Sequence, residues 1–133
     1  MEKTLKELKS LLRLAQVHKD FCLTRFREID RSKKALDARI KALEMQRAPR
    51  IGNVIDGVLA DKWQKWRKDR LNRLETQRDE IDTIWKNEQN RARQAVGRVE
   101  VIQELIRQRA TERDRGRARK NEYDLSENAM RLV

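Results

Sequence analysis

Apolar residues recur along this chain at alternating spacings of three and four, the heptad spacing that is typical of a coiled-coil seam. The first series lies before residue 47, and two lysines interrupt it: Leu5, Leu8, Leu12, Ala15, Lys19, Cys22, Phe26, Ile29, Lys33, Leu36, Ile40 and Leu43. The second series follows residue 70, and Arg78 and Glu88 interrupt it: Leu71, Leu74, Arg78, Ile81, Trp85, Glu88, Ala92, Ala95, Val99, Ile102 and Ile106. Each series predicts one long helix with a narrow apolar seam.

The segment between the two series contains Pro49 and Gly52. Proline pushes the residue before it out of the helical region, and glycine permits a left-handed turn, so the segment predicts a helix stop. We expect helices over residues 5–47 and 54–127 and a turn over 48–53. Since a short connector makes helices antiparallel neighbours, the predicted fold is all-α, a single coiled-coil domain over residues 1–133.

Side chains at the helix starts are consistent with these bounds. Thr4 and Glu7 have the spacing of a capping box, which places the first helix from about Leu5. Asn53 is suited to cap the second helix, with Asp56 in its favourable first turn. Between Leu59 and Leu71 the apolar phase slips, because Leu59, Trp63 and Trp66 keep a different phase from Leu71 and Leu74. Such a stutter unwinds a supercoil locally.

A turn centred near Arg50 and Ile51 would place residue i opposite about residue 101 minus i in an antiparallel hairpin. Lys19 would then lie near Asp82, Lys33 near Asp69, and Trp85 opposite the Ala15 region. The first helix would end opposite about Val96, so that the longer second helix overhangs at the terminal end. We therefore expect an unpartnered apolar surface on the overhang, made of Val99, Ile102, Leu105 and Ile106.

Composition limits the function classes that fit this chain. Charged residues make up 41% and aromatic residues 5%, which suits a narrow seam better than a broad core. The net charge of +11 indicates an acidic partner surface. The single cysteine, Cys22, lies in the seam, where a buried thiol in a reducing compartment is expected. No stretch has the length and apolarity of a membrane span, and we expect a cytoplasmic protein.

The sequence offers no constellation of residues that points to catalysis. His18 is the single histidine, with no second ligand at metal-binding spacing, and no glycine-rich phosphate loop or nucleophile elbow occurs. The carboxylates alternate with Lys and Arg on the predicted helix faces, which is typical of surface ion pairs. We therefore expect a protein that is not an enzyme and that needs no cofactor or metal.

Two candidate contact sites remain. Trp63 and Trp66 lie among basic residues just after the predicted turn, where they either close the hairpin tip against Leu43 and Ile40 or offer stacking surfaces to a partner. The second candidate is the basic overhang, whose cations are distributed around the helix, as suits a helix surrounded by a partner: Arg107, Arg109, Arg113, Arg115, Arg117, Arg119 and Lys120. A solubilising, frayed end is the alternative reading of the overhang.

A small basic antiparallel coiled coil with an arginine-rich C-terminal helix resembles the FliJ/YscO family. These are stalk proteins of flagellar and virulence-associated type III secretion systems. The final residues are similar to the basic, then acidic, then Leu-x-Glu-x-Ala ending common in that family: Arg119, Lys120, Asn121, Glu122, Tyr123, Asp124, Leu125, Ser126, Glu127, Asn128 and Ala129. The resemblance implies a monomeric stalk that inserts into a hexameric export ATPase, promotes its activity, and links it to the export gate protein and export chaperones.

Two other functions remain open on the residues alone. The arginine-rich end and the Trp63 region could track phosphates and stack bases, which would make the chain a nucleic-acid-binding protein. Alternatively, two hairpins could bury their apolar overhangs against each other as a homo-oligomeric scaffold. Dispersed acidic residues through both helices weigh against nucleic acid.

Overall fold

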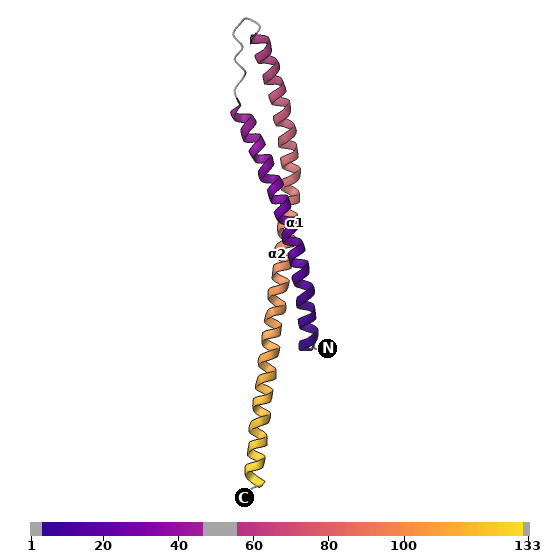
Figure 1. Cartoon of the computed structure of the whole chain (residues 1–133), viewed down its shortest axis with the longest axis vertical. Helices are drawn as coiled ribbons and strands as arrows, with labels where there is room; N and C mark the ends of the chain where they lie inside the picture. Colours follow the sequence, from indigo (N-terminus) through magenta and orange to yellow (C-terminus); the bar gives the residue numbers. More distant parts are fainter. Residues whose placement is uncertain (1–3, 47–55, 132–133) are drawn as a thin grey trace. The chain divides into compact units, whose positions relative to one another are not determined.

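The structure is a computed structural model that describes residues 4–46 and 56–131. Within these ranges the chain forms two α-helices and no strand, α1 (Leu5–Met45) and α2 (Asp56–Arg131) (Figure 1). The two helices pack against each other, which confirms the predicted all-α helical hairpin. The predicted turn over 48–53, with Pro49, Gly52 and the cap at Asn53, lies outside the described residues.

The N-terminus of α1 is capped as its sequence predicts. The backbone N–H of Glu7 donates to Oγ1 of Thr4 at 3.2 Å. The N–H of Leu8 donates to the backbone carbonyl of Thr4 at 3.0 Å. The first bond satisfies a donor that an uncapped first turn would leave without a partner, and the second is the first hydrogen bond of the helix itself. Thr4 is therefore the N-cap residue, and the helix begins at Leu5.

Both helices contribute to two compact units. The inner unit comprises Cys22–Ala92, and the terminal unit comprises Met1–Phe21 with Arg93–Val133. In the inner unit, α1 residues Leu36, Ile40 and Leu43 bury their side chains against Leu74 of α2, and Leu71 packs on this cluster. The tip therefore closes on leucines from α2.

Polar and aromatic contacts fix the register of the inner unit. Lys33 Nζ lies 3.2 Å from an Asp82 carboxylate oxygen, and the indole N–H of Trp85 donates to Asp30 at 3.0 Å. The ring centroids of Phe26 and Trp85 are 5.5 Å apart. Higher residue numbers on α1 meet lower ones on α2, so the helices of this unit are antiparallel.

The predicted register is wrong. Lys33 meets Asp82 rather than Asp69, and Trp85 meets Phe26 and Asp30 rather than the Ala15 region. Asp82 is thus the partner of Lys33 and not of Lys19. The physical reason is that a heptad seam tolerates a shift of about two repeats with little loss of apolar contact, so that sparse polar and aromatic contacts choose the register.

The terminal unit buries Leu8 of α1 together with Ala95 and Val99 of α2. Ile102 and Ile106 are half-buried. The predicted apolar interaction surface on the overhang is therefore wrong for these residues, because α1 covers more of α2 than the expected register allowed. Leu105, which stands outside the seam, remains 42% exposed.

The predicted seam positions are buried or half-buried throughout both heptad series. The interpretation of the stutter needs correction, because Leu59 and Trp66 are exposed. Ala60, Trp63 and Arg67 occupy the half-buried face there instead. Cys22 is buried, as its seam position predicts.

Candidate protein-interaction site

The C-terminal part of α2 has no helix packed against it within the terminal unit. Every side chain from Thr111 to Arg131 is exposed, whereas Arg109 and Ala110 just before it are half-buried. We call residues 111–131 the α2 extension. At a rise of about 1.5 Å per residue this helical segment is about 30 Å long. This confirms that the second helix overhangs, although the bare part begins later than expected.

Two of the predicted contact arginines, Arg107 and Arg109, precede the α2 extension, and the others lie on it. Arg107 forms an ion pair with Glu104, and the half-buried Arg109 lies 3.8 Å from a carboxylate oxygen of Glu112. These contacts join neighbours within one helix, at a spacing of three residues. Exposed pairs of this kind contribute only tenths of a kcal/mol, roughly 0.3–0.5. The exposed Arg107 therefore costs little to redirect toward a partner.

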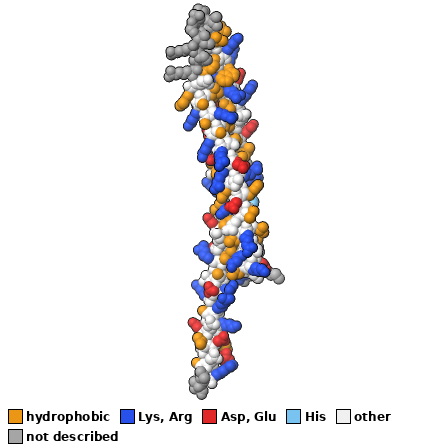
Figure 2. Space-filling view, in the orientation of Figure 1, with side chains coloured by type: hydrophobic (Ala, Val, Ile, Leu, Met, Phe, Trp, Pro, Cys, Tyr) orange, Lys and Arg blue, Asp and Glu red, His pale blue; other side chains and the backbone are white. Residues whose placement is uncertain are grey.

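The remaining predicted cations are exposed on the α2 extension, and among the described residues no carboxylate lies within ion-pair distance of them: Arg113, Arg115, Arg117, Arg119 and Lys120. The Nε–H of Arg119 donates to the backbone carbonyl of Arg115 at 3.4 Å. Figure 2 shows Lys and Arg side chains along the visible face, with acidic and hydrophobic side chains between them. The guanidinium groups of the α2 extension are thus available to an acidic surface.

The tryptophan candidates differ from each other. Trp66 is 52% exposed, whereas Trp63 is half-buried and has the guanidinium of Arg67 over its ring at 5.6 Å from the centroid. Neither belongs to the buried cluster around Leu43 and Ile40. Of the two readings of these indoles, the one in which both close the hairpin tip against Leu43 and Ile40 is not observed, because Leu71 and Leu74 pack there instead.

Arg67 has a structural role that the sequence did not reveal. Its Nε–H donates to the carbonyl of Leu43 at 3.0 Å, and its Nη2 donates to the carbonyl of Glu44 at 2.6 Å. Because the last carbonyls of a helix lack intrahelical partners, an arginine from α2 here caps α1. The sequence could have indicated this role only through a basic residue near the seam, and residues 61–70 contain five basic residues among which it does not distinguish Arg67.

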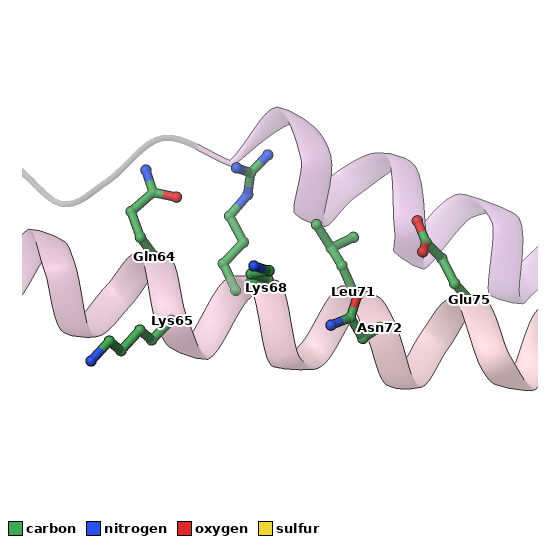
Figure 3. Close-up of a pocket in the computed structure, with 7 residues that line it drawn as sticks. Gln64, Lys65, Lys68, Leu71, Asn72 and Glu75 are labelled. Carbon is green, nitrogen blue, oxygen red and sulfur yellow. The ribbon is translucent and has the colours of Figure 1, made fainter.

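A shallow groove lies beside this cap. In Figure 3, Leu71 and Glu75 point from α2 toward α1, while Lys65 points away. Leu71 is the apolar residue among those that line the groove, and the others are polar or charged. Small-molecule sites are mostly apolar and concave, so this groove has the character of a helix–helix surface rather than of a ligand pocket.

Arg25 and Arg91 of the inner unit make structural contacts with one buried carboxylate. Glu88 is 4% exposed, and its Oε1 accepts hydrogen bonds from Arg25 at 3.0 Å and from Arg91 at 3.3 Å. A buried carboxylate is stable when charged donors satisfy it. The sequence marked Glu88 as an exception in the seam but did not identify its two partners.

Asp30 is held in its charged form by two contacts. The ammonium group of Lys34 at 2.8 Å, followed by the indole N–H of Trp85, lowers the pKa of the Asp30 carboxyl below its ordinary value. Donors to a carboxylate stabilise its ionised form. Asp30 therefore serves as a structural acceptor, and its lowered pKa does not suit a general base at neutral pH.

The described ranges 4–46 and 56–131 contain no group of three or more side chains arranged to hold a metal ion. Among the same residues, no helix has the length and apolarity needed to cross a membrane. Comparison of the chain with protein-family models, curated proteins and solved structures finds no match. The candidate site therefore depends on its own residues: a bare cationic helix in the terminal unit and a tryptophan-bearing surface in the inner unit.

Proposed function

We propose that this chain is a non-enzymatic stalk and adaptor of a type III export apparatus. In this proposal the α2 extension enters the pore of the hexameric export ATPase and promotes its activity. Other surfaces of the hairpin would contact the export gate protein or export chaperones. The chain would act in the cytoplasm, at the periphery of the membrane-embedded apparatus, as a monomer and without a cofactor.

The observation that carries this proposal is the exposed, helical and cationic α2 extension. Between residues 107 and 120 the chain has seven basic and two acidic residues. Their spread around the helix lets guanidinium groups face several directions, which suits a ring of acidic subunits around the helix. Long-range attraction between opposite charges would also speed the encounter with the ring.

The first test is ATP hydrolysis by a hexameric export ATPase mixed with the chain. We expect wild-type protein to stimulate hydrolysis. We expect replacement of Arg113, Arg115, Arg117 and Arg119 by serine to remove most of this effect without unfolding the hairpin, because these side chains are exposed. Circular dichroism checks the fold. Full stimulation by the folded variant would show that the extension is not the contact.

Nucleic-acid binding is a second candidate because of one observation. The indole of Trp66 is 52% exposed, and exposed Lys62, Lys65 and Lys68 surround it in the sequence. Bases stack on such an indole, and lysines attract phosphates. Titration of tryptophan fluorescence with a single-stranded oligonucleotide at two salt concentrations tests this function. Tight binding with a steep salt dependence would favour it over the stalk.

A further inference from the structure

The seam of α2 does not end where α1 ends. Counting onward from Ile106 at the same alternating spacing, the next seam positions are Arg109, Arg113, Gly116 and Lys120. Arg109 is half-buried, whereas the seam positions after it are exposed. Beyond it the same face continues into the bare α2 extension. The seam thus changes from apolar to basic where its partner helix ends.

Arg117 lies on this face as well, because it is four residues after Arg113 and three before Lys120. We call Arg113, Gly116, Arg117 and Lys120 the basic seam face. Its three cations are exposed, and a Cβ added at Gly116 would meet no atom within 4 Å. Two cations therefore follow a position without a side chain, where a partner backbone can approach closely.

We propose that the basic seam face is a docking surface for an acidic helix of a partner protein, which continues along the track that α1 occupies on α2. Charge complementarity carries this assignment. In the inner unit one seam cation and one seam carboxylate are each neutralised by the facing helix, since Lys33 meets Asp82 and the buried Glu88 meets Arg25. The basic seam face has cations at helical spacing, and no helix opposes it among the residues that the structure describes.

A helix fits this face better than the alternatives. A nucleic-acid backbone carries phosphates along its whole length and would meet Asp124 and Glu127, which follow Lys120 on the same side of the helix, whereas a partner helix can change its charge there. A second copy of this chain in the same direction would bring like charges together, which is unfavourable. An acidic helix with carboxylates spaced by three and four residues would pair with Arg113, Arg117 and Lys120 in turn.

The inference goes beyond the proposed stalk function because it names one face and the chemistry of its occupant, and it applies whichever protein supplies the helix. The arginines on other sides of α2 in and just before the extension, Arg107, Arg115 and Arg119, provide a matched control. They carry the same number of charges in the same segment but stand off the seam.

The probe is a fluorescently labelled, alanine-rich helical peptide with glutamates on one face, and fluorescence anisotropy measures its binding to the full chain. For the variant with Arg113, Arg117 and Lys120 replaced by glutamine, we expect binding to weaken about tenfold, and for the variant with Arg107, Arg115 and Arg119 replaced, less than about twofold. A peptide of equal composition with glutamates all round the helix should bind more weakly. Equal losses in the two variants, or equal binding of the two peptides, would overturn the proposal.

Gly116→Leu adds a steric test that leaves the charge unchanged. Leucine favours helix more than glycine does, so the variant should remain helical while its side chain obstructs the approaching backbone and weakens peptide binding. Unchanged binding would contradict close helix docking on this face. Circular dichroism confirms that the helix is intact.

Two further measurements separate the competing occupants. A single-stranded oligonucleotide that binds more tightly than the one-faced peptide, with equal losses in both charge variants, would assign the extension to nucleic acid. A dimer in light scattering that the seam variant abolishes would assign the face to a second copy. If both charge variants fail to stimulate the export ATPase while only the seam variant loses the peptide, the stalk function and the docking face both stand. Loss of peptide binding without any effect on the ATPase would separate the docking face from the stalk function.

Discussion

Basic residues have different roles in the inner unit and in the α2 extension. In the inner unit, charged side chains at or beside the seam find partners on the facing helix, as Arg25 does at Glu88 and Lys33 at Asp82. On the α2 extension, Arg113 and Lys120 hold equivalent heptad positions, and within the described ranges 4–46 and 56–131 no facing helix supplies a carboxylate. A basic residue in a seam is therefore structural or available for binding according to what lies opposite it.

This difference has an energetic side. Packing around Trp85 and the leucine cluster stabilises the inner unit, so its charges can only modulate a fold that apolar contact already supports. The α2 extension has no such packing, and its helix depends on backbone hydrogen bonds and intrinsic propensity. Substitutions should thus affect stability in the inner unit and binding in the extension.

The largest effect is expected at Trp85. Its replacement by alanine removes the contact with Phe26, the hydrogen bond to Asp30 and the cation–π contact with Lys33 at 4.2 Å. We expect a loss of about 3 kcal/mol in the free energy of unfolding, measured by urea denaturation. The exposed Trp66→Ala is the control and should stay within about 0.5 kcal/mol. Equal losses would remove the distinction between seam and surface indoles.

Next in size is the pair of arginines that satisfies Glu88. Replacing Arg25 and Arg91 by alanine leaves a buried carboxylate without charged donors. We expect a loss of about 1.5 kcal/mol, a moderate figure because both guanidinium groups remain partly in solvent. Glu88→Leu in the same background should restore stability, since an apolar residue then fills the seam. A double variant as stable as wild type would contradict this role of Glu88.

A smaller effect is expected in the α2 extension itself. Gly116→Ala should raise local helix stability by about 1 kcal/mol, because alanine has the higher helix propensity and its Cβ meets no neighbour. Hydrogen exchange of amides near residue 116 measures this change. If exchange is unchanged there, helix propensity does not control the extension, and an interaction with the rest of the chain must be sought.

The smallest effect concerns acid. Because Lys34 and Trp85 lower the pKa of Asp30, the stability that this carboxylate supplies is fully present above the ordinary aspartate pKa. It is lost as the pH falls through the lowered pKa of the folded state. The difference in urea midpoint between wild type and Asp30→Asn should therefore shrink on acidification. A difference that is independent of pH would show that Asp30 acts only as a neutral acceptor.

The helices and their buried faces could be predicted from sequence because heptad spacing determines which side of a helix is covered. Leu8, Leu36 and Val99 are buried where the series places them. The register could not be predicted in this way, since Lys33 finds an acidic residue at Asp69 or at Asp82 about two heptads apart. Side-chain fit at Trp85, which the period does not encode, selects one of them.

The candidate site could be predicted only in part, because some of its residues depend on the register. The cationic residues from Arg113 to Lys120 are exposed as expected, because α1 is shorter than α2 and does not cover them. Val99 and Ile106 were assigned to the wrong surface, since that assignment depended on the register. Arg67 escaped notice because a capping arginine is recognised by the carbonyls it meets at Leu43 and Glu44, and those are distant in sequence.

Hydrogen exchange of the chain alone and in complex with a hexameric export ATPase tests whether the α2 extension is the contact. We expect amides of the α2 extension, residues 111–131, to exchange fastest among the helical residues of the free protein and to gain the largest protection in the complex. Amides around Leu74 and Trp85 should change little. Protection around Trp63 and Trp66 while the extension stays unprotected would show that the extension is not the contact.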